Sequence, residues 1–540
     1  MKWVLERIYS KPCDPHYEAD LNECQRLVAD MSAIMGNSFS SIDLLPLLDK
    51  LSFAYELADK LKVYLELTLM LDAGDLVAKE TLISVDALVE DVQNIKYGLA
   101  NKYAENPNIF HSVLINEKYK GLLLELKQLS RYPSILHHAI SVMRLTGSGA
   151  WRGFRTEKMS EVQVKENKSF GVLQTIIRGG SVEEADEAFL QDVMLSQKAA
   201  ADSLTALRYI KTEFLNRCKL YNFSSPLDYM LDLYRIEHKL FNSIMSEAEN
   251  VGNKAVNELM AVTGKDRLKL YELDRVGDSF EKIEYSDCIR IVKDCFAARS
   301  QELKELIENV EEEMLIDNEP RKGKRSGACI ISLHACKQSY ILTNDTGSAR
   351  AIISLAHEMG HCYHHSKMFQ NPIVENNSPM IINEFISKFF ELWISDYLAD
   401  AGIMSSSLIK ELRLKGQVQT FCQTMARYYF ESDFFLALDH GEINLDNTSY
   451  MMKKAQLKAF CGKLDPAYSN PYEWVTKPHY YYTDIALYNF PYIIGNILAL
   501  KYYEKFKTGN LQLNEIGIAL AQSGRIESFQ EFLNIVGVFL

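Results

Sequence analysis

The stretch SARAIISLAHEMGHCYHH, residues 348–365, constrains this chain more than any other. Its apolar residues recur at helical spacing, which predicts an amphipathic α-helix with one packed face and one open face. His357 and His361 are four residues apart, so both imidazoles leave the same face and can bind one metal ion. Glu358 lies about 100° around the helix from His357. There it can accept a proton from a water molecule held by the metal.

A third metal ligand is expected from the apolar segment PMIINEFISKFFELWISDYLADA, residues 379–401. Apolar residues cover nearly its whole circumference, which predicts a buried helix. Glu384 and Glu391 are seven residues apart on one face of it, and a buried carboxylate needs a strong partner. A metal ion would satisfy Glu384, and two histidines with one carboxylate leave a fourth position for water, as in catalytic zinc sites.

Alternatives remain open for each of these residues. The two histidines would merely be exposed on a surface helix if the HExxH pattern were accidental. Glu384 would instead form a salt bridge with a lysine or arginine. Glu375, in the loop between the two helices, ranks second as the carboxylate ligand. Cys362 adjoins a proposed ligand but points about 100° away from it, so we assign it to packing.

The bulk properties exclude some classes of partner. A net charge of −13 and a pI near 5.5 argue against nucleic acid or an anionic membrane, because both repel such a surface. No apolar run reaches the roughly 18–20 residues that span a bilayer, and the N-terminal residues lack a signal-peptide core. Ten cysteines without CxxC pairs indicate reduced thiols. We therefore expect a cytoplasmic protein.

The first part of the chain predicts helices. Residues 20–140 are rich in Leu, Ala, Glu and Lys at helical spacing. The Gly-rich LTGSGAWRG, residues 145–153, predicts a loop or hinge, and SEVQVKEN, residues 160–167, a short strand. Residues 182–315 again predict helices, with breaks near 222–226 and 264–287. We place a domain boundary at 180, between an N-terminal helical domain (1–180) and a catalytic domain (181–540).

The segment before residue 348 differs from the rest. GACIISLHA and QSYILTN are rich in β-formers and predict a hairpin over residues 327–344. A strand edge there could pair with an extended peptide and hold it over the metal. The basic run RKGKR, residues 321–325, predicts a solvated loop, with an anion site as the alternative.

HEMGHCYHH followed by NEFISKFFEL resembles the thimet oligopeptidase and oligoendopeptidase F family of zinc metallopeptidases. That family has the pattern HExGHxxH and then a phrase like AEVASTFNEL, in which Glu384, Ser387 and Glu391 match the two glutamates and the serine. The resemblance implies one zinc ion per chain, held by His357, His361 and Glu384, with Glu358 as the general base. It also places His364 and Glu391 behind the ligands, where Glu391 would orient a ligand histidine or a tyrosine.

A second segment carries the same resemblance. KPHYYYTDIALYNFPYIIG, residues 477–495, is similar to the family's substrate loop of histidine and tyrosine. This likeness implies that His479, Tyr488 and Tyr492 reach into the cleft, where one of them would stabilise the oxyanion. Packing is the alternative, because seven tyrosines lie between residues 480 and 503.

The family resemblance implies a mainly α fold with two helical lobes, a deep substrate channel and a small sheet beside the zinc helix. It implies a zinc-dependent endopeptidase that cleaves internal bonds of short unstructured peptides, with metal-held water as nucleophile and Glu358 as base. Two alternatives stay open: a zinc aminopeptidase or carboxypeptidase, and a non-catalytic helical peptide-binding protein. The sequence predicts short peptides as partners and gives no oligomeric state.

Overall fold

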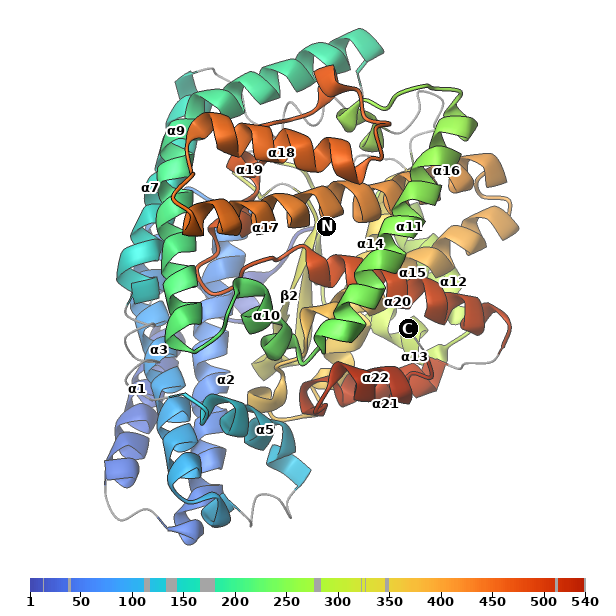
Figure 1. Cartoon of the computed structure of the whole chain (residues 1–540). Helices are drawn as coiled ribbons and strands as arrows, with labels where there is room; N and C mark the ends of the chain where they lie inside the picture. The colour runs from blue at the N-terminus through green and yellow to red at the C-terminus, as the bar shows by residue number, and fades with distance from the viewer. Residues whose placement is uncertain are drawn as a thin grey trace.

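The computed structural model is mainly helical with one small sheet, as the sequence predicts (Figure 1). It describes the chain except residues 13, 37–39, 111–116, 133–142, 166–179, 276–282, 322, 326, 345–348, 510–512 and 539–540. The N-terminal helices agree with the predicted run: α1 (Pro15–Gly36), α2 (Ser41–Leu71), α3 (Leu76–Glu105) and α5 (Lys120–Leu129). Asp75 begins α3 by accepting a hydrogen bond from the backbone N–H of Ala78.

The predicted loop at 145–153 is wrong. A π-helical turn (Met143–Ser148) leads directly into α7 (Gly149–Lys165), and α7 also contains the described part of the predicted strand, residues 160–165. The remaining residues of that strand, 166 and 167, lie outside the described residues. Glycine disfavours a helix by about 1 kcal/mol, but α7 packs along the next helix, and packing outweighs local propensity.

The second helical run begins where the sequence predicts. Ser181 and Glu184 form a capping box at the start of α9 (Val182–Leu220). A break follows, and Ser225 caps α10 (Pro226–Tyr234). The run continues with α11 (His238–Thr263), α12 (Tyr285–Ala297) and α13 (Gln301–Glu312).

The predicted hairpin is confirmed. It consists of β2 (Cys329–Leu333) and β3 (Gln338–Leu342), which pair antiparallel from Cys329↔Leu342 to Leu333↔Gln338. A short strand that the sequence did not predict, β1 (Ile316–Asp317), pairs parallel with β3, so the order is β1-β3-β2 and β2 is an edge strand.

The basic run at 321–325 is not simply solvated. The side chain of Lys324 is fully buried and lies 2.7 Å from Asp317, which Arg321 also contacts at 2.8 Å. Two of the basic side chains therefore neutralise one buried carboxylate beside the sheet.

The C-terminal part contains α14 (Ala349–Met368), which carries the HEMGH motif, and α15 (Met380–Asp400), which carries the two glutamates. Pro379 stands at the N-cap position of α15, without a side-chain hydrogen bond to cap the helix. The later elements are α16 (Ser406–Val418), a π-helical turn (Gln419–Thr424), α17 (Met425–Asp439), α18 (Leu445–Ala459), α19 (Glu473–Thr476), α20 (Phe490–Lys507), α21 (Leu513–Ala521) and α22 (Phe529–Ile535).

Helix α15 lies between α14 and α20 and is buried, as predicted from its apolar circumference. Two glycines make these contacts close. A Cβ atom on Gly360 of α14 would lie 2.7 Å from the Cα of Ser387, and one on Gly495 of α20 would lie 2.8 Å from the carbonyl oxygen of Ile381. The backbones of the three helices can approach this closely only because both positions lack a side chain.

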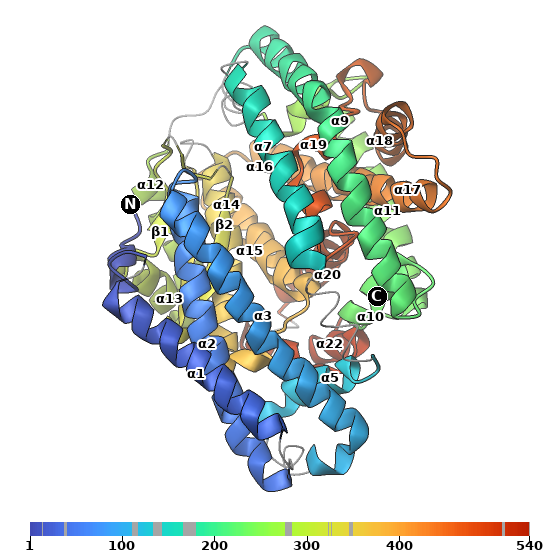
Figure 2. The same cartoon turned by 90° about the vertical axis from the view of Figure 1, so that its left-hand side faces the viewer.

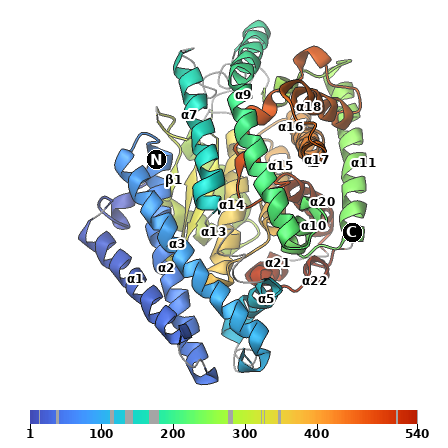
Figure 3. The same ribbon diagram turned by 60° about the vertical axis from the view of Figure 1, so that its left-hand side comes forward.

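Two groups of helices flank this central layer. Figure 3 shows α1–α3 on one side of α14 and α15, and α9–α11 on the other. In Figure 2, α2 lies beside β2 while α7 runs along α9, and packing contacts support both arrangements. Helix α7, which precedes residue 180, packs along α9, which follows it. The domain boundary proposed at residue 180 therefore stays a prediction. Among the described helices, none has both the length and the apolar character needed to cross a membrane.

We expect Gly360→Ala to lower the free energy of unfolding by about 1–3 kcal/mol, because its methyl group would push α14 off α15. Urea unfolding of the metal-free protein measures this change. Gly153→Ala in α7 is the matched control: no atom lies within 4 Å of its added Cβ. It should be neutral or stabilising by up to about 1 kcal/mol. Equal effects of the two substitutions would contradict the close-packing argument.

Candidate active site

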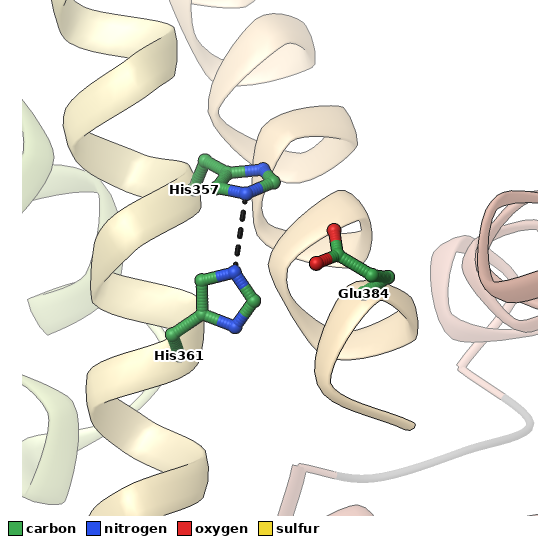
Figure 4. Close-up of side chains that lie close together, drawn as sticks. All are labelled: His357, His361 and Glu384. Atoms are coloured by element: carbon green, nitrogen blue, oxygen red, sulfur yellow. Dashed lines mark hydrogen bonds between the residues drawn. The ribbon is translucent and has the colours of Figure 1, made fainter. Parts of the chain in front are cut away.

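His357, His361 and Glu384 come together where α14 packs on α15 (Figure 4). One possible ligand atom from each residue lies within 4.8 Å of the other two. The Nε2 atoms of the two histidines are 3.2 Å apart, and the carboxylate of Glu384 faces them from the neighbouring helix. Glu384 is 7% exposed and His361 is 9% exposed. The structure thus brings together the three residues that the sequence singles out.

Glu391 lies behind His357, as the family resemblance implies. Its Oε1 atom accepts a hydrogen bond from His357 Nδ1 at 2.6 Å, so the Nε2 atom of His357 is left to face the site. Lys388, which the sequence analysis missed, donates to the other carboxylate oxygen of Glu391 at 2.6 Å. The i, i+3 spacing of Lys388 and Glu391 could have indicated this pair.

The pKa values of these two groups follow from their contact. Burial would lower the pKa of His357, but the hydrogen bond and the charge of Glu391 outweigh burial and raise it to about 9. Burial would likewise raise the pKa of Glu391, but the charge of Lys388 and the hydrogen bond from His357 lower it to about 2. Glu391 is therefore a permanent carboxylate at neutral pH.

The other two carboxyl groups lack such a partner. Glu358 is 5% exposed, and burial raises its pKa to about 7 against the opposing charge of His357. Burial also raises the pKa of Glu384 to about 7. Among the described residues, neither group forms an ion pair with a lysine or arginine. Two buried carboxylates and the half-buried Glu391 around one lysine leave an excess of negative charge that a divalent cation would compensate.

The donor geometry also fits a zinc ion. Tetrahedral zinc with Zn–N distances of about 2.0–2.1 Å requires ligand nitrogens about 3.3 Å apart. The 3.2 Å between the histidine Nε2 atoms agrees with this spacing. Two imidazoles and one carboxylate are also a common ligand set for catalytic zinc. The residues that are present therefore suit the ion.

The aromatic candidates lie together at the start of α20. The hydroxyl groups of Tyr488 and Tyr492 are 3.2 Å apart, and the ring of His479 stacks on Tyr488 with ring centres 5.4 Å apart. Asn489 Nδ2 donates to His479 Nε2 at 3.1 Å. Burial holds the pKa of His479 well below its usual value, so its ring is neutral. A hydrogen bond from the Tyr492 hydroxyl favours the charged form of Glu384 and so opposes the rise in the pKa of Glu384. Tyr492 therefore lies beside the proposed ligand carboxylate.

Three other residues from the sequence analysis have partners outside the His357–His361–Glu384 cluster. Glu375, the second-ranked ligand, is buried against the backbone N–H of Gly121 at 2.8 Å and the guanidinium of Arg525. It is thus neutralised away from the histidines. His364 is bonded through Nε2 to Ser523 at 3.0 Å, which ties α14 to the turn before α22. Cys362 is buried, and burial raises its pKa to about 12, in keeping with packing.

The part of the chain that contains both site helices is similar to a known peptidase family. Residues 298–527, which include both site helices, match Peptidase family M3. An oligoendopeptidase F homolog of Lactococcus lactis is 24% identical over 270 residues, 46% of this chain and 42% of the relative. An oligoendopeptidase F homolog of Borreliella burgdorferi is 24% identical over 370 residues, 66% of this chain and 61% of the relative. The chain thus matches about half the length of these relatives.

Solved structures show the same fold over nearly the whole chain. PZ peptidase A, solved with an inhibitor, has a TM-score of 0.80 at 14% identity and covers 96% of this chain and 93% of its own. Oligoendopeptidase F from Enterococcus faecium has a TM-score of 0.67 at 14% identity, covering 99% and 94%. Metallocarboxypeptidase 1 of Trypanosoma cruzi has a TM-score of 0.54 at 12% identity, covering 91% and 97%. The predicted two-lobed helical fold is confirmed, and residues 298–527 are similar to peptidase family M3, with oligoendopeptidase F proteins among the relatives.

Proposed function

We propose that this chain is a zinc-dependent endopeptidase that hydrolyses internal bonds of short unstructured peptides. The observation that carries the proposal is the convergence of His357, His361 and Glu384 beside the buried Glu358, within the residues that match peptidase family M3. A zinc ion held by the three side chains would supply Lewis-acid activation of water and of the scissile carbonyl.

Glu358 is the general base in this proposal. In the metal-free protein burial raises the pKa of Glu358 to about 7, a value that suits a group which accepts a proton from water and returns it to the leaving amine near neutral pH. Glu391 orients His357 through its 2.6 Å hydrogen bond and is itself held by Lys388. We therefore assign Lys388 and Glu391 to positioning.

The phenols of Tyr488 and Tyr492 are the candidate donors to the oxyanion. Burial raises the pKa of both, so each hydroxyl keeps its proton and can donate a hydrogen bond. His479 stacks on Tyr488 and is the third candidate. The loss of one oxyanion donor typically lowers the rate about 10²- to 10³-fold.

The edge strand β2 suits an extended peptide. It contacts α14, its residues Cys329–Ser332 are only partly buried, and one of its edges is not paired with another described strand. A peptide paired with that edge would run beside the site, and its main-chain hydrogen bonds would not depend on side-chain identity. Such pairing requires an extended substrate, which favours short unstructured peptides.

A zinc aminopeptidase or carboxypeptidase is the alternative. The same fold occurs in a protein named as a metallocarboxypeptidase, so the fold does not decide between the two. We expect cleavage of a fluorescence-quenched peptide of about ten residues that is acetylated at one end and amidated at the other. Mass spectrometry of the products locates the cleaved bond. An exopeptidase would leave the doubly blocked peptide intact while it shortens the unblocked one.

Glu358→Gln should lower kcat by about 10²- to 10⁴-fold and retain zinc, because the base is lost and the ligands remain. Glu384→Ala should lose zinc, since a ligand is removed. Zinc content by atomic absorption and peptide hydrolysis measure both effects. Equal loss of zinc in the two variants would overturn these roles, and full activity of Glu358→Gln would identify a non-catalytic Glu358.

The apparent zinc affinity should rise with pH up to about 9. In the metal-free protein the pKa of Glu384 is raised to about 7 and that of His357 to about 9, so zinc must displace these protons. Each displaced proton makes affinity rise about tenfold per pH unit below its pKa, so the slope should lessen above pH 7. Competition with a chelator measures the affinity. Glu358→Gln is the matched control and should keep the dependence; constant affinity from pH 6 to 9 would contradict it.

A further inference from the structure

A cavity of about 370 Å³ lies between α7 and α9, apart from the His357–His361–Glu384 cluster. The aromatic rings of Trp151 and Tyr209 line it together with Arg208, Glu213, two threonines and an asparagine. Figure 3 shows α7 and α9 side by side, across from α1–α3. The cavity is thus large enough for one amino-acid side chain, and aromatic, charged and polar side chains line it.

Glu213 is the unusual residue of this cavity. It is 6% exposed, and its Oε2 atom has no hydrogen-bond partner among the described residues. Its Oε1 atom has only a long contact of 3.3 Å from Arg217 Nη2, and that nitrogen also donates to the carbonyl oxygen of Thr483 at 2.6 Å. A buried carboxylate oxygen without a donor is costly, and a bound cation or water molecule would supply the missing partner.

The rings beside Glu213 favour a cation. Trp151 and Tyr209 lie with ring centres 5.4 Å apart and planes 34° apart, and Tyr209 is 42% exposed. A Cβ added to Gly147 would lie 3.0 Å from the Tyr209 hydroxyl and 3.5 Å from Glu213 Oε2, so these two polar atoms lie near each other beside Gly147. Aromatic faces next to a carboxylate suit an ammonium or guanidinium group, which gains both cation–π attraction and an ion pair.

Other charges set limits on the ligand. Arg208 lies at the exposed rim, where its charge is screened by water, and it disfavours a ligand with two positive charges. Arg217 donates to the carbonyl oxygen of Thr483 and also forms an ion pair of 3.3 Å with Glu213 Oε1, so Oε2 is the one Glu213 oxygen without a donor among the described residues. The net charge of −13 attracts a cationic peptide to the protein as a whole.

The cavity is linked to the proposed active site through one side chain. Arg217 lies one turn after Glu213 on α9 and bonds the backbone of Thr483, in the segment between His479 and Tyr488. We propose that this cavity binds the side chain of a single lysine or arginine residue of the peptide substrate. The role of the cavity in substrate recognition rests on the proposed peptidase function. Binding of a basic side chain to the cavity does not require catalysis.

Direct binding to the zinc-free protein tests this site. The probes are Nα-acetyl-arginine amide and Nα-acetyl-citrulline amide, which have nearly the same shape and differ in side-chain charge. We expect the arginine probe to produce a saturable change in tryptophan fluorescence that is lost in Trp151→Phe, and the citrulline probe to bind at least about tenfold more weakly. Equal binding of both probes, or no saturable binding to a cavity that holds only water, overturns the proposal.

Glu213→Gln should weaken binding of the arginine probe at least about tenfold while the thermal midpoint stays within a few degrees of the parent. Glu187→Gln is the matched control, because Glu187 is an exposed glutamate on the same helix, and it should bind the probe unchanged. Binding that is insensitive to Glu213→Gln would rule out the assigned carboxylate. If Glu213→Gln unfolds, Trp151→Ala with calorimetric detection provides the same test from the aromatic side.

A kinetic comparison then separates this inference from the proposed function. Zinc-loaded protein should cleave an arginine-containing peptide with a higher kcat/KM than its citrulline counterpart, chiefly through KM, and Glu213→Gln should abolish that difference without changing the citrulline rate. Absence of all hydrolysis would contradict the proposed function and leave the binding result to decide on the cavity. Equal kcat/KM for both peptides would exclude the cavity from substrate recognition.

Discussion

The close contact of α14 and α20 with the two sides of α15 is the constraint on which the site depends. Gly360 and Gly495 allow the backbones to meet, and this contact brings Glu384 to within ligand distance of His357 and His361. The same contact brings Tyr492 of α20 near Glu384. Segments more than a hundred residues apart thus form one site because three helices pack without intervening side chains.

This packing has an electrostatic cost. It buries the carboxyl groups of Glu358 and Glu384, and Lys388 pairs only with the half-buried Glu391, so the pKa values of Glu358 and Glu384 rise to about 7. A divalent cation would restore the balance of charge. The tight apolar packing of the helices thus fixes the positions of the site residues. The uncompensated negative charge of their carboxylates favours the binding of a metal cation.

The outer helices add a second level of organisation. One group, α1–α3, packs against the sheet whose edge strand runs beside α14, and the other carries α9, whose Arg217 reaches the segment of His479 and Tyr488. Recognition of the peptide main chain and of a basic side chain would therefore be assigned to opposite groups of helices. In this arrangement, one catalytic centre would recognise both the main chain and a basic side chain of the same substrate.

The sequence by itself determined what depends on local periodicity: most helices, the hairpin, and the placement of His357, Glu358 and His361 around one helix. It also identified Glu384, because a carboxylate in an apolar helix needs a partner. The tertiary structure decided that this carboxylate rather than Glu375 meets the histidines, that residues 145–153 are helical, and that Lys324 is buried. These outcomes depend on contacts between segments that are distant in the chain. Such contacts override the local secondary-structure preference of the residues, and they leave no pattern in the local sequence.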